Sequence, residues 1–516
     1  MDKQAVYARR WWTLGVLCLS TLIIGFDTTI LNVALPTLVR SLAATASQLQ
    51  WIVDAYTLVF AGLLLTTGSL GDRFGRQRLL LLGLAVFALG SLLGSLADSA
   101  AHLIAVRALM GVGGALIMPS TLAVMTTVFP REERARAIAV WSAMAFLGIT
   151  LGPVIGGWLL DHYTWHAVFL VNLPVIALAL GASLVLVPES KNPAVAVLDP
   201  LGAALSVAGL AALLYAIIEA PTRGWTNAMT LAALAAAVAL LTAFIAWEGR
   251  CPRPMLDLRL FAEPRFGAAS LSIALVMFAL MGALFLLTQY MQFVLGYAPF
   301  GAGVRIIPLT LGLACGAAVG AALVTRLGVR WVVAGGLAVV AGGLGILATV
   351  TTTSGYGPVA LALSVLGLGM GVAAPPATDA IMGAVPTERA GVGSAVNDTT
   401  QEVGGALGVA VLGSVLAAVY SAALAPAVHD LPAPLALAAR NSLGAALRVA
   451  QRLGGGAGPA LQAAARVAFV QAMHVTVVIG VGMALAGVLV AVVFLPARAT
   501  QAAPPAAVRE PEVVRS

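Results

Sequence analysis

Charged residues are scarce in this sequence. Asp, Glu, Lys and Arg make up 9% of its 516 residues, whereas a soluble globular domain typically carries about 25%. Hydrophobic residues make up 60%, and the mean hydropathy is +1.00. The apolar residues fall in runs of about twenty, which is the length that a helix needs to cross a membrane. Barrel strands would show alternating segments of about ten residues. The composition therefore excludes a soluble protein and predicts an all-α polytopic membrane protein.

Cysteine and histidine are also rare, and no nucleotide-binding loop is present. Cys18, Cys251 and Cys315 offer neither a disulfide framework nor a zinc site. The histidines show no metal-ligand spacing; they are His102, His162, His166, His429 and His474. The pattern Gly-x-x-x-x-Gly-Lys-Ser/Thr does not occur, which removes the usual ATP-driven route. We expect no enzyme activity, no metal and no cofactor.

Apolar runs of spanning length predict fourteen transmembrane helices. They cover residues 12–38, 51–70, 79–97, 102–127, 137–160, 167–187, 201–219, 229–248, 267–292, 303–325, 331–351, 358–382, 392–418 and 470–495. The first run begins at Trp11-Trp12, and no small-residue cleavage site follows a short apolar core. We therefore expect a retained span rather than a signal peptide. An even number of spans puts both termini on one side of the membrane.

The distribution of Lys and Arg predicts which side that is. The net charge of +7 comes from basic loops, so it is read as a topology signal rather than as a nucleic-acid surface. Cytoplasmic termini make the following residues cytoplasmic: Lys3, Arg9, Arg10, Arg73, Arg76, Arg78, Arg131, Arg134, Arg136, Lys191, Arg250, Arg253, Arg259, Arg265, Arg326, Arg330, Arg389, Arg498, Arg509 and Arg515. Short outer loops or helix ends then keep only Arg40, Arg223 and Arg305. We predict a multi-pass protein of the plasma (inner) membrane with both termini in the cytoplasm.

Loops that contain proline and charge divide the predicted helices into units. The units are an N-terminal six-helix bundle over 1–190, an inserted transmembrane helix pair over 191–262, a C-terminal six-helix bundle over 263–500 and a cytoplasmic tail over 501–516. The C-terminal bundle carries a long outer loop over 419–468. Its alanine content favours helix, and Gly454-Gly455-Gly456 favours a break. Two interpretations stay open for this loop, a cap over an outer vestibule and a passive linker.

A glycine- and arginine-rich loop follows the second predicted helix. It contains Gly68, Gly71, Asp72, Arg73, Gly75 and Arg76. Glycine permits a tight turn, and Asp72 can pair with arginine or with a helix N-terminus. A charged cytoplasmic loop of no further function is the plainer interpretation. The spacing nevertheless resembles the signature loop of the major facilitator superfamily. A shorter echo without the aspartate occurs at 326–330, as expected of two parallel six-helix halves.

The fifth predicted helix carries a second glycine motif. Gly148, Gly152 and Gly156 recur every four residues and share one face, and Pro153 and Gly157 complete the pattern. Ordinary glycine packing competes as an explanation, because the chain has 55 glycines. The full pattern resembles the antiporter motif of drug exporters in the same superfamily. The resemblance implies export rather than import.

Several ionisable residues fall inside the predicted spans. Arg107 of the fourth helix matches the family's helix-four arginine, although Met110 stands where the family usually has Gln. Burying this cation costs at least about 2.5–3.5 kcal/mol, so we expect a partner for it or a water-filled setting. The acids in spans are Asp27, Asp54, Asp379, Asp398 and Glu402. Asp398 and Glu402 lie four residues apart and hence on one helix face.

Acids at this depth predict a proton or cation site in a central cavity. Apolar surroundings favour the protonated form of a carboxylate, and a second acid on the same face favours it further. Such a group can hold a proton or a cationic substrate but holds both poorly, and this competition is the physical basis of antiport. Asp54 and Asp379 lie near enough to helix ends for water or a cap to satisfy them instead. Aromatic residues near the acids, such as Phe26 and Tyr56, can bind lipophilic cations or simply pack.

The segments Trp51-Ile52-Val53-Asp54-Ala55-Tyr56 and 398–404 sharpen the resemblance. They are similar to matching segments of the fourteen-helix drug:proton antiporters, which include the quaternary-ammonium exporters. The resemblance covers essentially the whole chain. It implies proton-coupled export of lipophilic, mostly cationic drugs by alternating access, driven by the proton gradient and without a cofactor. The implied partners are small hydrophobic or cationic molecules, protons and the lipid bilayer, with no nucleic acid, and the implied state is a monomer.

Other functions stay open on the sequence alone. A dedicated exporter of one secondary metabolite or antibiotic would use the same fold and the same coupling. A membrane sensor or scaffold without transport would be favoured by a soluble partner-binding domain, and none is visible in the sequence.

Overall fold

The computed structural model describes residues 7–191, 199–252, 254, 256, 258–384 and 390–495. All regular elements in these ranges are helices, as the composition predicts. Thirteen of the described helices are long and apolar enough to cross a membrane. The remaining predicted span, 51–70, lies within a helix of 29 residues that is not among those thirteen.

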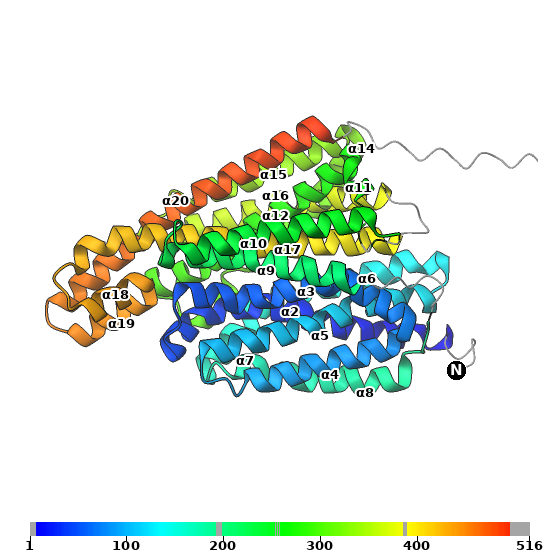
Figure 1. The fold of residues 1–516 in the computed structure, drawn as a ribbon, viewed down its shortest axis with the longest axis horizontal. Helices are drawn as coiled ribbons and strands as arrows, with labels where there is room; N and C mark the ends of the chain where they lie inside the picture. The colour runs from blue at the N-terminus through cyan, green and yellow to red at the C-terminus, as the bar shows by residue number, and fades with distance from the viewer. Residues whose placement is uncertain are drawn as a thin grey trace, which may run out of the picture.

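The helices are grouped by the three consecutive units that the sequence predicts (Figure 1). The first half contains α2 (Arg10–Leu42), α3 (Ala46–Phe74), α4 (Arg76–Gly94), α5 (Ala100–Val128), α6 (Arg131–His162), α7 (Ala167–Leu170) and α8 (Asn172–Leu186). The inserted pair is α9 (Pro200–Arg223) and α10 (Ala228–Arg250). The second half contains α11 (Arg259–Ala262), α12 (Pro264–Gln289), the π-helical turn η1 (Tyr290–Val294), α13 (Pro299–Val304), α14 (Ile307–Leu327), α15 (Val329–Leu347), α16 (Tyr356–Gly383), α17 (Ala390–Leu424), η3 (Ala425–Val428), α18 (Ala433–Asn441), α19 (Leu443–Leu453) and α20 (Ala457–Phe494).

We call the side of the bundle that holds residues 42–46 the outer side, following the predicted orientation. Residues 425–456 lie on the same side, beyond the ends of the other helices (Figure 1). The opposite side is the inner side, where α2 begins and α3 ends.

Glycine makes the equivalent tight turn in both halves. Gly75 joins α3 to α4 with φ +119°, and Gly328 joins α14 to α15 with φ +80°. Only glycine adopts such angles without strain, because it lacks a Cβ. The two turns fall in the signature loop and in its echo at 326–330, so the repeated sequence pattern corresponds to a repeated backbone shape.

The inserted pair covers one side of the seam between the halves. Helix α9 packs against both α3 of the first half and α17 of the second, and α10 packs on α9. Leu58 of α3, Leu214 and Ile218 of α9, and Ala406 and Ala410 of α17 form one buried apolar cluster. The pair therefore adds to the outside of the two halves without separating α3 from α17, which remain in direct contact.

The outer segment is shorter than the predicted loop 419–468. Helix α17 continues to Leu424, and α20 begins at Ala457. The residues between them form η3, α18 and α19, which lie over the outer end of the bundle (Figure 1). Arg448 of α19 donates a hydrogen bond to the carbonyl of Val39 near the end of α2. These contacts favour a cap over a passive linker.

Candidate functional site

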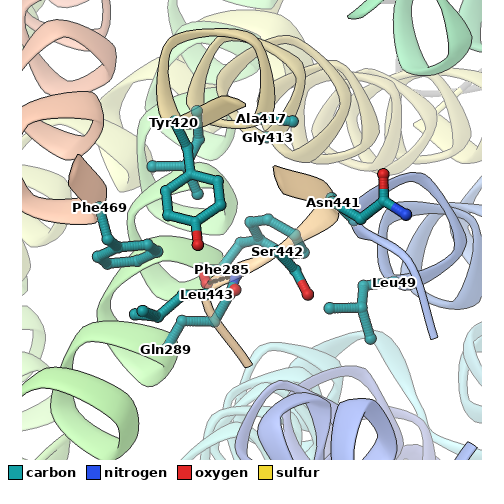
Figure 2. A pocket seen from close by; sticks show the side chains of 12 residues that line it. Leu49, Phe285, Gln289, Gly413, Ala417, Tyr420, Asn441, Ser442, Leu443 and Phe469 are labelled. Atoms are coloured by element: carbon teal, nitrogen blue, oxygen red, sulfur yellow. Dashed lines mark hydrogen bonds between the residues drawn. The ribbon is translucent and has the colours of Figure 1, made fainter. Parts of the chain in front are cut away.

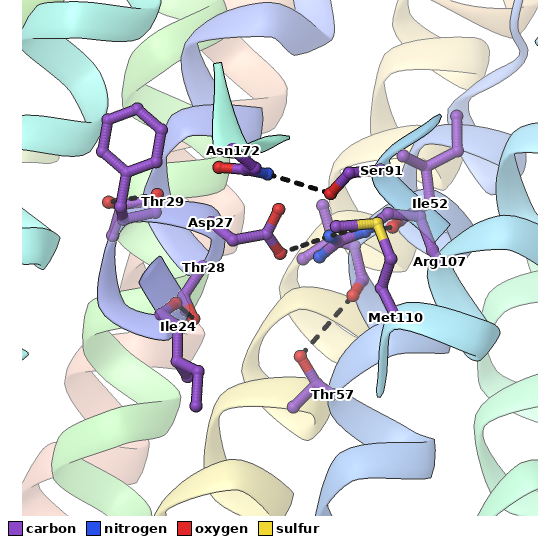
Figure 3. A network of polar contacts seen from close by, with 12 residues as sticks. Ile24, Asp27, Thr28, Thr29, Ile52, Thr57, Ser91, Arg107, Met110 and Asn172 are labelled. Carbon is purple, nitrogen blue, oxygen red and sulfur yellow. Dashed lines mark hydrogen bonds and ion pairs between the residues drawn. The ribbon is translucent and has the colours of Figure 1, made fainter. Parts of the chain in front are cut away.

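The centre of the first half holds a buried ion pair (Figure 3). Arg107 Nη1 lies 2.5 Å from Asp27 Oδ2, and the two side chains are 2% and 1% exposed. Asp27 lies near the middle of α2, and Arg107 lies two turns into α5. Each charge supplies the partner that the other needs in a low-dielectric interior. The partner expected for Arg107 is thus one of the predicted acids, a pairing across 80 positions of sequence.

The arginine makes further contacts that fix its orientation. Its Nε donates to the carbonyl of Ile52 at 3.1 Å, and its guanidinium carbon lies 4.4 Å from the ring centroid of Tyr56. The sulfur of Met110, which replaces the family's Gln, lies 4.0 Å from Nη1. Residues of α2, α3 and α5 therefore hold one cation, and any change in the charge of Asp27 acts on all three helices.

Asp54 lies outside this network. Its side chain is fully buried, and neither carboxylate oxygen has a hydrogen-bond partner. Helical periodicity places it on the face of α3 that carries Trp51 and Leu58, and both of those residues pack against the α9 and α17 cluster. The inserted pair therefore shields Asp54 from the lipid side.

Asp398 and Glu402 lie on α17 and are both half-buried. Asn397 donates to Asp398 Oδ1 at 3.1 Å and accepts a hydrogen bond of 3.1 Å from Thr378 of α16. Glu402 and Tyr420 are five turns apart and hence on one face. That face lines the seam between the halves, because Tyr420 lines a small cavity between residues of α3 and residues of α12 and α17. The two acids are therefore aligned along the seam. Glu402 lies close enough to Tyr56 for an electrostatic interaction, and the Tyr56 ring contacts Arg107, so the seam acids and the Asp27–Arg107 pair approach one another through Tyr56.

Asp379 differs from the other acids because its side chain is exposed. It lies one turn before the inner end of α16 at Gly383. The structure does not bring it together with Asp398, Glu402 or Asp27 through a hydrogen bond among the described residues. Its position agrees with the plainer interpretation, in which water reaches an acid near a helix end.

The glycine motif of the fifth predicted helix joins α6 to α2. A Cβ added at Gly148 would lie 2.5 Å from the carbonyl oxygen of Leu22, and one added at Gly152 would lie 2.8 Å from that of Phe26. Gly156 faces Ile30 of α2. The two backbones can approach this closely only because no side chain stands between them.

The same motif also reaches the second half. A Cβ added at Gly157 would lie 2.6 Å from the Cα of Phe300 in α13, and Gly303 of α13 packs directly on the carbonyl of Pro153. The motif therefore forms a packed contact between the halves at the outer side.

The signature loop is held by contacts at the inner side. Arg76 Nη1 donates to the carbonyl of Ala123 at 3.0 Å and to the hydroxyl of Thr127, so it ties the start of α4 to α5. Arg78 pairs with Glu189 at 3.4 Å. Arg73 is exposed, and the side chain of Asp72 lies outside the described residues.

A second ion pair lies at this inner side. Arg10 Nε donates to Glu133 Oε2 at 2.7 Å, which joins α2 to the start of α6. This hydrogen bond from Arg10 lowers the pKa of Glu133. The inner ends of α2 and α6 are therefore linked by charge, whereas their middles are joined by glycine packing.

The hydrogen bonds that join described residues of the two halves lie in the outer third of the helices. Gln292 Nε2 donates to the carbonyl of Val33 at 2.8 Å, and the Phe300 amide donates to Asp161 at 3.2 Å. Ser414 donates to Gln50 at 3.4 Å. Arg448 and Val39 form the fourth pair. The molecule is therefore closed at its outer side.

A small cavity remains in this closed seam (Figure 2). Leu49 of α3, Phe285 and Gln289 of α12, Tyr420 of α17 and Leu443 of α19 line it, together with neighbouring residues. It has room for roughly one water molecule. The seam is therefore packed at its outer end apart from this small cavity.

Sequence reasoning missed the uncharged polar residues of the seam. Gln289, Gln292 and Asn397 lie in spanning segments, and their position in an apolar run was the available signal. Phe26 and Tyr56, the aromatic residues that the sequence analysis names for cation binding, are both buried in the packed core. Among the described residues, no group of three or more His, Cys, Asp or Glu side chains could hold a metal ion.

Two packed groups of membrane-spanning helices, with ionisable side chains between and within them, define an integral-membrane transporter rather than an enzyme. The chain belongs to the Major Facilitator Superfamily, whose profile matches residues 17–409. The signature loop and the glycine motif of α6 both fall within the matched range.

Named relatives within this family are resistance and efflux proteins. The multidrug resistance protein Stp of Mycobacterium tuberculosis is 39% identical over 409 residues, covering 79% of this chain and 76% of the relative. The multidrug efflux pump LfrA of Mycolicibacterium smegmatis is 36% identical, covering 93% and 95%. The methyl viologen resistance protein SmvA of Salmonella typhimurium is 36% identical, covering 90% and 93%.

Solved structures share the fold. A bacterial homologue of the human lysosomal transporter Spinster, in an inward-facing and unoccupied conformation, matches with a TM-score of 0.68 at 20% identity. The match covers 96% of this chain and 99% of that one. At this identity the comparison establishes the arrangement of helices and nothing about substrate.

Proposed function

We propose that this protein exports lipophilic, mostly cationic drugs in exchange for protons by alternating access. The observation that carries the proposal is the buried Asp27–Arg107 pair, because a carboxylate at this depth can exchange a proton only by giving up its hold on a cation. Relatives named for multidrug efflux and for resistance to methyl viologen, an organic dication, support export and cationic substrates.

Protonation of Asp27 is the coupling event in this mechanism. The charged carboxylate holds Arg107, and the neutral carboxyl releases it, so that the contacts of α5 with α2 and α3 change together. Asp398 and Glu402 act on the seam side, where a drug cation and protons compete for the same oxygens. Asp54 and Asp379 are further candidates for proton or cation binding.

The closed outer side identifies which state of the alternating-access cycle this conformation represents. It is the state that faces the cytoplasm, from which an exporter loads its substrate. The signature loop, with Gly68, Gly71, Asp72, Arg73, Gly75 and Arg76, acts as the conformational switch at the inner side. The antiporter motif of α6, with Gly148, Gly152, Pro153, Gly156 and Gly157, keeps the outer side closed through α2 and α13.

We also propose a topology and an oligomeric state. Both termini lie in the cytoplasm, and the protein works as a monomer. Exchange of more than one proton per monovalent cation moves net charge, and the membrane potential then contributes about 2.3 kcal/mol per elementary charge per 100 mV.

Uptake of a fluorescent lipophilic cation into everted membrane vesicles tests the function. Uptake is driven by an imposed proton gradient in the wild type, in Asp27→Asn and in Asp98→Asn. Asp98 is a matched control, because it lies in the outer loop between α4 and α5 with 90% of its side chain exposed. We expect gradient-dependent uptake in the wild type and the control and its loss in Asp27→Asn.

The alternative outcomes separate the parts of the proposal. Uptake retained in Asp27→Asn would move the coupling role to Asp398 and Glu402. Wild-type vesicles that take up no cation despite a stable gradient would overturn the broad cationic specificity. A dedicated exporter of one metabolite or antibiotic would then be the better reading.

A further inference from the structure

Two buried side-chain hydrogen bonds join described residues of the halves, and both come from uncharged side chains. Gln292 is 6% exposed, and its Nε2 donates to the carbonyl of Val33 in α2 at 2.8 Å. The amide of Phe300 bonds an exposed residue at 3.2 Å, and Ser414 bonds Gln50 at 3.4 Å. Of the two buried bonds, that of Gln292 is the shorter, and the Arg448–Val39 bond is only partly buried.

A π-helical turn presents this glutamine. Residues Tyr290–Val294 form η1, and the amide of Leu295 donates to the carbonyl of Tyr290 at 3.1 Å. Such turns are rare inside α-helices and frequently occur at functional sites. The turn adds a residue relative to an α-helix and so changes the direction in which Gln292 leaves α12.

The acceptor in α2 lies in a turn that proline disturbs. Pro36 has no N–H, so the carbonyl of Asn32, four residues earlier, lacks its usual helical donor. The ring also pushes the preceding turn open. The neighbouring carbonyl of Val33 is then accessible to a side chain from another helix, and Gln292 uses that access.

The surrounding amide oxygens make this contact easy to exchange for water. Asn32 Oδ1 and Gln292 Oε1 are buried without a hydrogen-bond partner. Opening the outer side would hydrate Gln292 Oε1 while breaking the bond of Gln292 Nε2 to Val33. The hydrogen bond from Gln292 to Val33 therefore stabilises the closed state only modestly, because in the open state water supplies hydrogen bonds to the same groups.

We propose that Gln292 is the latch of the outer gate, meaning the closed contact between the halves at the outer side. Its hydrogen bond to the carbonyl of Val33 joins η1 to α2 while the outer side is closed, and this bond breaks when the halves separate. The proposal rests on alternating access as the mechanism of the protein. The latch is a positioning element, because it sets the balance between the closed and open outer side without touching a proton site.

Labelling of a cysteine in the closed seam measures this balance. Leu49 is 1% exposed and lines the small cavity, so Leu49→Cys should react with a membrane-impermeant maleimide only when the outer side opens. Intact cells would carry this substitution in a background in which Cys18, Cys251 and Cys315 are replaced by alanine. The rate requires neither substrate nor a proton gradient, so it is independent of the transport assay.

Two substitutions remove the latch without removing the polar character of the site. Gln292→Asn keeps the amide but is one methylene too short, and Gln292→Glu keeps the length but loses the N–H donor. We expect each to raise the labelling rate about fivefold, as expected for the loss of one hydrogen bond. Gln289→Asn and Gln289→Glu are matched controls, because in the described part of the chain the Gln289 side chain bonds the Phe285 carbonyl of its own helix and makes no hydrogen bond to the other half. Gln289 lines the same cavity as Leu49, so these variants also report any direct effect of a nearby amide or charge on labelling.

Acidic pH provides a second readout. Because maleimide reacts with the thiolate, all labelling rates fall with pH, and each rate is compared with that of Leu49→Cys alone at the same pH. A protonated Glu at position 292 can donate to Val33 again, so the relative rate of Gln292→Glu should return toward one as the pH falls. The relative rate of Gln292→Asn should stay high. The charged or titratable groups described near this turn are Arg40, Arg448, Arg466, Tyr290 and His474. The arginines keep their charge and the Tyr290 hydroxyl keeps its proton in acid. Any effect of His474 would appear equally in Gln292→Asn, which therefore serves as the baseline.

Three results would overturn the latch. These are labelling of both Gln292 variants at the wild-type rate, an equal increase in the Gln289 controls, and a pH response shared by Gln292→Asn and Gln292→Glu. Successful vesicle transport together with any of them would refute the latch alone. Failed transport with the expected labelling pattern would refute the proposed substrate and coupling while leaving the gate in place.

Discussion

Arg107 depends on Asp27 for its charge balance, because both side chains are almost completely buried. A buried pair contributes little net stability, yet removing one partner leaves a charge that nothing compensates. The carbonyl of Ile52 and the ring of Tyr56 stabilise the guanidinium but carry no negative charge.

A double-mutant cycle at this pair should show strong coupling. Asp27→Asn or Arg107→Gln alone should lower the free energy of unfolding by about 3–5 kcal/mol, and the double substitution should cost much less than the sum. Thermal unfolding of the purified protein in detergent measures this, and transport should be lost in all three variants. Additive losses of stability would show that the two charges do not depend on one another.

The candidate site was predictable from sequence at the level of its charged members. Asp27 and Arg107 stand out because charge is expensive in a spanning segment. Their pairing could not be derived, since 80 positions separate them and only the packing of α2 on α5 brings them together. Gln292 escaped notice because an amide is much cheaper to bury than a charge and leaves a weaker signal in an apolar run.

At the scale of the element, α6 and α2 are in contact along their backbones. The glycines of α6 remove side chains at the positions where carbonyls of α2 approach. Other glycines have no such role, and Gly181 of α8 has nothing within 4 Å of the position a Cβ would take.

Gly148→Ala should therefore force α2 and α6 apart, while Gly181→Ala should not. Overpacking typically costs about 1–3 kcal/mol, whereas alanine in an open helical position gains up to about 1 kcal/mol over glycine. We expect a lower melting temperature for Gly148→Ala and an unchanged or higher one for Gly181→Ala. Equal melting temperatures would show that the close approach at Gly148 relaxes freely.

The sequence predicts a helix boundary well where the helix ends at the membrane surface, and poorly where the helix continues into water. The span predicted over 201–219 corresponds to α9 at 200–223. The span predicted from residue 470 belongs to a helix that begins at Ala457, because hydropathy marks the entry into lipid while the alanine-rich backbone continues as helix in water. The contacts of 425–456 with α2 likewise depend on tertiary packing, which composition does not encode.

At the scale of the whole molecule, the predicted orientation assigns each loop to one side of the membrane. Gly355 precedes α16 at the outer side, and Gly249 lies at the inner end of α10. Both residues are exposed, and a Cβ at either position would meet nothing within 4 Å.

An impermeant maleimide should label Gly355→Cys and not Gly249→Cys in intact cells, in a background without the native cysteines. The same reagent applied to everted vesicles should give the reverse pattern. The reverse pattern in intact cells would place both termini outside and would invert the predicted topology.

Helix α20 extends well beyond the bilayer. Its 38 residues measure about 57 Å at a rise of 1.5 Å per residue, about 27 Å more than the hydrocarbon core. Together with α18 and α19, its first turns form a projection at one end of the molecule (Figure 1). In electron microscopy, a helical bundle hidden in a detergent belt offers little to align. A projection of this kind gives each particle a recognisable top and provides an epitope to which an antibody fragment can bind.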